Sequence, residues 1–262
     1  MELQQVPALN IAAIIFSLIV SVFLPVALCL FSYRKWHAKL SCFVVGFVTF
    51  FVSALVLEQL LHMLVLGVLA PSLSKNVMLY AAYGAAAATL FEECGRLVAF
   101  KILMKNRAST PNAFMYGVGH GGAEAILLVG VTMINNLSAA IMINSGQMQT
   151  SLSQMDAASQ QSALQMLSPL WSAPASQYLL GGLERFPAIA LQIALSLLVF
   201  YAVKTGAKQF FFLAMFFHFA ADFVTVIAAS FLPLALAEGL IVLVVFICCY
   251  TVFKIYRSHA SA

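Results

Sequence analysis

Seven long apolar runs constrain this chain more than any other feature of its sequence. Each run has 18 or more mostly apolar residues, and a helix needs about 20 of them to cross the hydrocarbon core of a bilayer. The runs are residues 8–32, 41–69, 77–103, 111–134, 186–203, 210–230 and 234–254. Strands of a membrane barrel would be about half as long. The sequence therefore predicts an all-α, polytopic bundle of about seven transmembrane helices.

The composition excludes several classes of protein. Hydrophobic residues make up 63% of the chain and charged residues only 8%, against about 25% charged residues in a typical soluble domain. So few charges cannot cover a water-facing surface, which argues against an ordinary soluble enzyme and a disordered adaptor. The 13 basic residues are spread thinly, so no nucleic-acid partner is expected. We expect one integral membrane domain over residues 1–262, surrounded by lipid.

The basic residues also predict the orientation of the chain. Ten of them lie at alternate connections on one side of the predicted spans: Arg34, Lys35, Lys39, Lys101, Lys105, Arg107, Lys204, Lys208, Lys254 and Arg257. Only Lys75 and Arg185 lie on the other side. Because basic connections stay in the cytoplasm, the N-terminus is expected outside and the C-terminus inside.

One predicted connection is much longer than the rest. Residues 135–185 are rich in Ser, Gln, Ala and Met, and residues 151–167 have helical spacing of apolar side chains. The favoured interpretation is a solvated extracytoplasmic loop with a short helix on the bilayer surface. A loop of this length is also a place for a lid or a substrate-docking element.

Ionisable residues inside the spans are the main functional signal, because a charge in the membrane interior costs several kcal/mol by insertion scales. Nine ionisable residues lie within the runs: Glu58, His62, Glu92, Glu93, Arg96, His120, Glu124, His218 and Asp222. In the third, fourth and sixth runs the acidic and His residues lie eight to thirteen positions from the predicted cytosolic edges. That distance is about 12–20 Å of helix. Three helices thus place polar groups at one depth, which predicts a single buried polar site.

Spacing within each helix indicates which groups share a face. His120 with Glu124, and His218 with Asp222, are pairs four residues apart and so lie one turn apart on one face. Arg96 follows a glutamate pair by three and four residues, so it can neutralise one carboxylate and leave the other to exchange a proton.

Two further patterns concern the surroundings of this site. Gly117, Gly119, Gly121 and Gly122 flank His120, and such small residues let membrane helices approach closely. Glu58 and His62 form another pair four residues apart, nearer the predicted outer face. That pair is interpreted as mutually satisfied or as part of an outer vestibule, in preference to a catalytic role.

Three ordered motifs carry a resemblance to a known family. They are Phe-Glu-Glu-Cys-Gly-Arg at 91–96, Gly-His-Gly-Gly-Ala-Glu at 119–124 and His-Phe-Ala-Ala-Asp at 218–222. Together they resemble the glutamic-type intramembrane proteases, which include the CAAX prenyl endopeptidases and bacteriocin-processing relatives. The second motif is most similar to the YhfC family. The resemblance implies an intramembrane endopeptidase of a bacterial plasma membrane, acting on a membrane-associated protein or peptide.

The resemblance also implies roles for individual residues. Glu92 or Glu93 would activate water with the assistance of His120 and His218. Asp222 would orient His218 or help to stabilise the oxyanion. Arg96 would set the charge of the glutamate pair, and Glu124 completes the candidate catalytic set.

The same residue types leave the chemistry open. Two carboxylates and two imidazoles can hydrolyse a peptide bond without a metal. They can also bind Zn²⁺, whose catalytic sites use three N or O ligands and a water, with Glu93, His120 and His218 as candidate ligands. The sequence has no His-Glu-x-x-His motif, which favours the metal-free mechanism over the metalloprotease alternative.

Two other functions are compatible with ionisable residues inside the spans. Relays of Glu, His and Asp within a membrane also serve proton- or ion-coupled transporters, but here they cluster at one depth. An inactive membrane scaffold of the same fold would be expected to lose at least one of Glu92, Glu93, His120 and His218, and all four are present.

Overall fold

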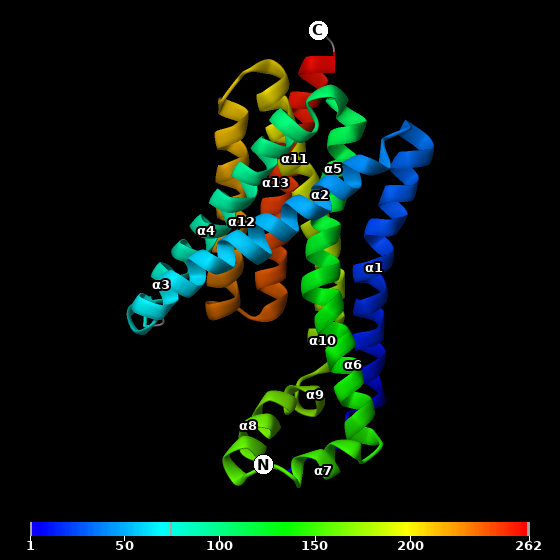
Figure 1. The fold of residues 1–262 in the computed structure, drawn as a ribbon, viewed down its shortest axis with the longest axis vertical. Helices are drawn as coiled ribbons and strands as arrows, with labels where there is room; N and C mark the ends of the chain where they lie inside the picture. The colour runs from blue at the N-terminus through cyan, green and yellow to red at the C-terminus, as the bar shows by residue number, and fades with distance from the viewer. Residues whose placement is uncertain (1, 74, 261–262) are drawn as a thin grey trace. The chain divides into compact units, whose positions relative to one another are not determined.

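The apolar runs are helical along most of their length. In the computed structural model, which describes residues 2–73 and 75–260, every regular element is a helix (Figure 1). Six stretches of the described residues are long and apolar enough to cross a membrane: Ala8–Trp36, Leu40–Val68, Thr110–Asn144, Ala175–Thr205, Gln209–Phe231 and Leu234–Ser258. The chain is therefore a multi-pass membrane protein with an all-α architecture, as predicted.

The predicted run 77–103 is helical but is not one of these six stretches. It forms α4 (Val77–Val98) followed by a π-helical turn (Ala99–Leu103). With 22 residues α4 is long enough to span a membrane, so its composition excludes it. Glu92, Glu93 and Arg96 lower its hydropathy. Length and apolar content thus support six spans instead of the expected seven.

Contacts divide the chain into two compact units, residues 1–24 with 124–186 and residues 25–123 with 187–262. The first unit contains the beginning of α1 (Ala8–Trp36) and five helices that lie between residues 124 and 186. They are α6 (Val131–Asn144), α7 (Gln147–Leu152), α8 (Ala157–Leu167), α9 (Pro169–Ser172) and α10 (Ala175–Leu183).

The long predicted connection is more ordered than a solvated loop. Residues 135–144 continue α6, and α10 begins at Ala175, so the connection between the two membrane stretches is shorter than the predicted 135–185. α8 lies within the range predicted to be helical. Asn10 on α1 donates hydrogen bonds of 2.9 Å to the carbonyl oxygens of Leu170 and Ala173. The pattern of apolar residues did not predict these contacts, because Asn10 is a polar residue within an apolar run. Through them α1 binds the segment that contains Leu170 and Ala173.

The second unit holds the remaining long helices. These are α2 (Leu40–Val52), α3 (Glu58–Leu73), α4, most of α5 (Thr110–Glu124), most of α11 (Arg185–Thr205), α12 (Gln209–Phe231) and α13 (Leu234–Ala260). A π-helical turn (Ser53–Leu57) joins α2 to α3. α4 packs against α2, α3 and α12, and α12 packs against α13 (Figure 1). α4 is therefore the central helix of this unit.

Glycines bring α5 into close contact with α2 and α11. A methyl group on Gly119 would lie 2.8 Å from the Cα of Phe43 on α2. One on Gly117 would lie 2.6 Å from the Cα of Ile193 on α11. Such distances are too short for real contacts, so only glycine permits this packing. The close approach predicted from the glycines around His120 is confirmed.

Candidate active site

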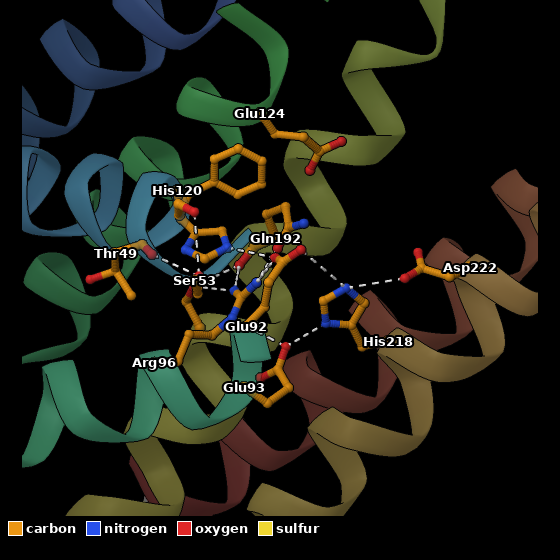
Figure 2. Close-up of polar contacts among 12 residues, drawn as sticks. Thr49, Ser53, Glu92, Glu93, Arg96, His120, Glu124, Gln192, His218 and Asp222 are labelled. Carbon is orange, nitrogen blue, oxygen red and sulfur yellow. Dashed lines mark hydrogen bonds and ion pairs between the residues drawn. The ribbon is translucent and has the colours of Figure 1, made fainter. Parts of the chain in front are cut away.

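Polar side chains from four helices of the second unit converge on α4 (Figure 2). α4 supplies Glu92, Glu93 and Arg96, α5 supplies His120, α11 supplies Gln192 and Ser196, and α12 supplies His218 and Asp222. All of them except Asp222 are buried. The structure thus gathers six of the seven candidate catalytic residues in one cluster, as expected from their predicted common depth.

Glu92 lies between the two imidazoles. Its Oε2 atom is 2.8 Å from His120 Nε2, and its Oε1 atom is 4.0 Å from His218 Nε2. Arg96 contacts it only weakly, with 3.5 Å between Nη2 and Oε2. Glu92 is therefore the carboxylate that faces both histidines.

Glu93 has different surroundings although it is the next residue. Its Oε1 atom is 2.7 Å from His218 Nδ1 and 3.2 Å from Arg96 Nε. Its side chain is fully buried, and its Oε2 atom has no hydrogen-bond partner among the described residues. Glu93 thus contacts a cation and the Nδ1 atom of His218. Glu92 instead faces the Nε2 atom of that ring.

Of the two predicted pairs four residues apart, His218 with Asp222 lies in the cluster, whereas Glu124 does not join His120 there. Asp222 Oδ2 lies 3.5 Å from His218 Nε2, with 37% of the Asp222 side chain exposed. Glu124 belongs to the other unit, where its Oε1 atom forms an ion pair of 3.0 Å with Arg185. Arg185 was expected in an outer connection, but it is buried and also contacts Glu184 at 3.1 Å.

Gln192 and Ser196 were missed by sequence reasoning. Arg96 donates to the Gln192 side-chain oxygen, to the Gln192 main-chain oxygen at 2.9 Å and to Ser196 Oγ at 2.8 Å. The available signal was two polar residues four positions apart in the apolar run 186–203. Neither residue is ionisable, so the pattern of buried charges does not include them.

Glu58 and His62 form a second polar group with Tyr83. His62 Nε2 is 3.1 Å from Glu58 Oε1, and His62 Nδ1 is 2.8 Å from the Tyr83 hydroxyl. These side chains come from α3 and α4. The pair is thus mutually bonded, as expected.

The chemistry of the main cluster suits a cation. With neutral imidazoles, the three carboxylates of Glu92, Glu93 and Asp222 face the single positive charge of Arg96, which leaves a net charge of −2 if all are ionised. Uncompensated buried charge is costly. No three His, Cys, Asp or Glu side chains in the described parts of the chain already form a ready-made metal site. However, His120 Nδ1 is a buried atom without a hydrogen-bond partner among those residues.

Comparisons with known proteins agree with these observations. A membrane protein of Bacillus subtilis (strain 168), described as uncharacterized membrane protein YhfC, is 38% identical over 197 residues, which cover 74% of this chain and 76% of that protein. No solved structure matches the chain. The model of the family described as YhfC intramembrane metalloprotease matches residues 20–245, a range that contains every residue of the cluster. The chain therefore belongs to the YhfC intramembrane metalloprotease family, and it is a protease by family.

Proposed function

We propose that this protease hydrolyses a peptide bond of a membrane-embedded protein or peptide, with Glu92 as the general base. One observation carries the assignment: the Glu92 carboxylate lies between His120 and His218, with one oxygen directed to each imidazole. Peptide hydrolysis requires a base for water, a donor for the oxyanion and an acid for the leaving amine. This constellation provides all three within one buried cluster.

Glu92 takes the proton of the attacking water and returns it to the leaving nitrogen. Glu93 accepts a hydrogen bond from His218 Nδ1, which fixes the ring and leaves its Nε2 atom directed toward Glu92 and Asp222. Arg96 neutralises part of the negative charge of the glutamate pair. The two adjacent glutamates therefore have separate tasks.

The family description implies a metal ion, which favours the metalloprotease alternative over the metal-free mechanism. The residues fit such an ion, because the cluster has excess negative charge and N and O donors of the kinds that Zn²⁺ prefers. His120, His218 and Asp222 would hold it, with Glu93 supporting His218 from behind instead of serving as a ligand. When bound, Zn²⁺ supplies a Lewis acid that polarises the substrate carbonyl.

Cleavage of peptides by the purified protein tests this function. Proteoliposomes containing the chain are expected to cleave members of a transmembrane-peptide library, detected by mass spectrometry. Treatment with 1,10-phenanthroline should abolish cleavage, and added Zn²⁺ should restore it, because the polarising ion is removed and replaced. Cleavage that persists in metal-free protein would exclude the zinc mechanism while keeping the protease. Potential-driven ion flux without any cleavage would contradict both.

We further propose that α4 is a seventh span, with the N-terminus outside and the C-terminus in the cytoplasm. The ten-to-two distribution of basic residues supports this orientation. Ion pairs of Glu92 and Glu93 with Arg96, and their contacts with histidines of α5 and α12, offset part of the cost of these charges in the membrane.

Alkaline phosphatase fusions test this topology, because the enzyme is active only outside the cytoplasm. Fusions after Gln161 should be active, and fusions after Arg107 and after Ala262 should be inactive. An N-terminal tag should be accessible on intact cells. If both termini lie on the same side, the number of spans is even and α4 does not cross.

A further inference from the structure

Four hydrogen bonds and one ion-pair contact surround the guanidinium of Arg96. Its Nη1 atom donates to the Gln192 main-chain oxygen at 2.9 Å and to Ser196 Oγ at 2.8 Å. Its Nη2 atom donates to Gln192 Oε1 and, at 3.5 Å, to Glu92 Oε2. Its Nε atom is 3.2 Å from Glu93 Oε1. Three of these five contacts thus come from α11 and two from the glutamate pair. Figure 2 shows Arg96 beside Gln192 and the two glutamates.

Because Arg96 is buried, the loss of any of these acceptors is costly. Arg96 and Ser196 have no exposed surface, and Gln192 is 5% exposed. Water therefore cannot replace a lost acceptor, and an unpaired donor of a buried charged group is costly. If the acceptors of α11 were removed, the guanidinium would turn toward the nearest remaining ones, which are the two carboxylates.

We infer that Gln192 and Ser196 are positioning residues, which hold Arg96 back from Glu92. Their acceptors keep the guanidinium close to Glu93 and only loosely in contact with Glu92. Glu92 is then available to the imidazoles instead of being locked in a bidentate ion pair with Arg96. This inference rests on the proposed role of Glu92 as the general base.

Two local features fix the positions of these residues. Ser196 Oγ also donates to the Gln192 main-chain oxygen at 2.7 Å, one turn away on the same helix. Gly121 of α5 packs against Gln192, and a methyl group there would lie 3.0 Å from Gln192 Cβ. α5 therefore restricts the Gln192 side chain from one side while Arg96 binds it from the other.

A double-mutant cycle between Gln192 and Arg96 tests the inference. Gln192→Leu removes the amide acceptor at similar volume and is expected to lower kcat by about 10–100-fold, the usual cost of losing a supporting partner. KM should stay unchanged, because Gln192 is buried and therefore closed to a bound peptide. In an Arg96→Lys background, the same substitution should change kcat by less than about 2-fold, since its effect passes through the guanidinium.

Matched variants separate positioning from general damage. Ser196→Ala should lower kcat in the same direction, and Ser196→Thr, which keeps the hydroxyl, should restore it. Gln177→Leu, on the exposed face of α10, should have no effect. Unfolding temperatures identify variants that fail to fold. If Gln192→Leu is one of them, the comparison of Ser196→Ala with Ser196→Thr tests the inference instead.

The outcomes distinguish this inference from the proposed function. Equal fold-losses for Gln192→Leu in the wild-type and Arg96→Lys backgrounds would overturn the positioning role alone. The cycle is repeated with Zn²⁺ affinity measured by competition, which Gln192→Leu should leave unchanged in both backgrounds, because Glu92 is not among the proposed ligands. A wild-type protein that neither cleaves peptides nor binds Zn²⁺ would overturn the proposed function, and the inference with it.

Discussion

Replacing Glu92 by Gln is expected to lower kcat about 10²–10⁴-fold, the range that a positioned general base contributes. The amide has nearly the same shape as the carboxylate but cannot take a proton from water. Zn²⁺ binding should persist, because the proposed ligands His120, His218 and Asp222 are unchanged. Peptide cleavage in proteoliposomes and metal content of the purified variant are the two measurements.

Glu93→Gln is the matched comparison, since it alters the adjacent carboxylate of the same helix. Glu93 contacts His218 Nδ1 and Arg96 Nε, so its loss should weaken Zn²⁺ binding about 10–100-fold, as for other outer-shell partners. If Glu93→Gln were inactive and Glu92→Gln active, the roles proposed for Glu92 and Glu93 would be reversed. Loss of Zn²⁺ from Glu92→Gln would make Glu92 a ligand.

His218→Ala is expected to remove both Zn²⁺ binding and cleavage. His218 contacts Glu93 through one ring nitrogen and faces Glu92 and Asp222 through the other, so its loss changes the surroundings of all three carboxylates. The loss of affinity should exceed the 10–100-fold that outer-shell changes cost. Zinc titration of the apo-protein, together with the cleavage assay, measures both effects. His120→Ala should behave in the same way.

His62→Ala is the control for these substitutions. His62 also lies in a membrane helix and is hydrogen-bonded to Glu58 and Tyr83, but it belongs to the second polar group. Its removal should leave Zn²⁺ stoichiometry at the wild-type value. If His218→Ala retains zinc while His62→Ala loses it, the metal belongs to the second group and the proposed site is wrong.

The all-α membrane architecture followed from the sequence alone. Apolar run length is a local property, and a buried backbone in lipid must satisfy its hydrogen bonds within a helix or a closed barrel. The gathering of α4, α5 and α12 was also predictable, because ionisable residues are so scarce in the apolar runs that their equal depth is informative. The family resemblance rested on the same three motifs.

Other features depended on contacts between distant residues. The polarity of α4 made its membrane role ambiguous, since its charges are paired partly within α4 and partly with side chains of α5, α11 and α12. Residues 135–144 and α10 extend helices into the range predicted as a loop. Their stabilisation comes from partners such as Asn10, about 160 positions away along the chain.

Helical periodicity tells which residues of one helix share a face, but not which faces meet. The spacing of Glu92 and Glu93 from Arg96 therefore left their roles open, and the pairing of Glu124 with Arg185 was not foreseen. Packing of α4 against α12 and α5 turns Glu92 toward both imidazoles and Glu93 toward the rear of His218. The sequence determined the all-α membrane architecture and predicted that the polar residues meet in one cluster. Only the tertiary structure decided which carboxylate faces the histidines, because that choice depends on the relative rotation of helices distant in sequence.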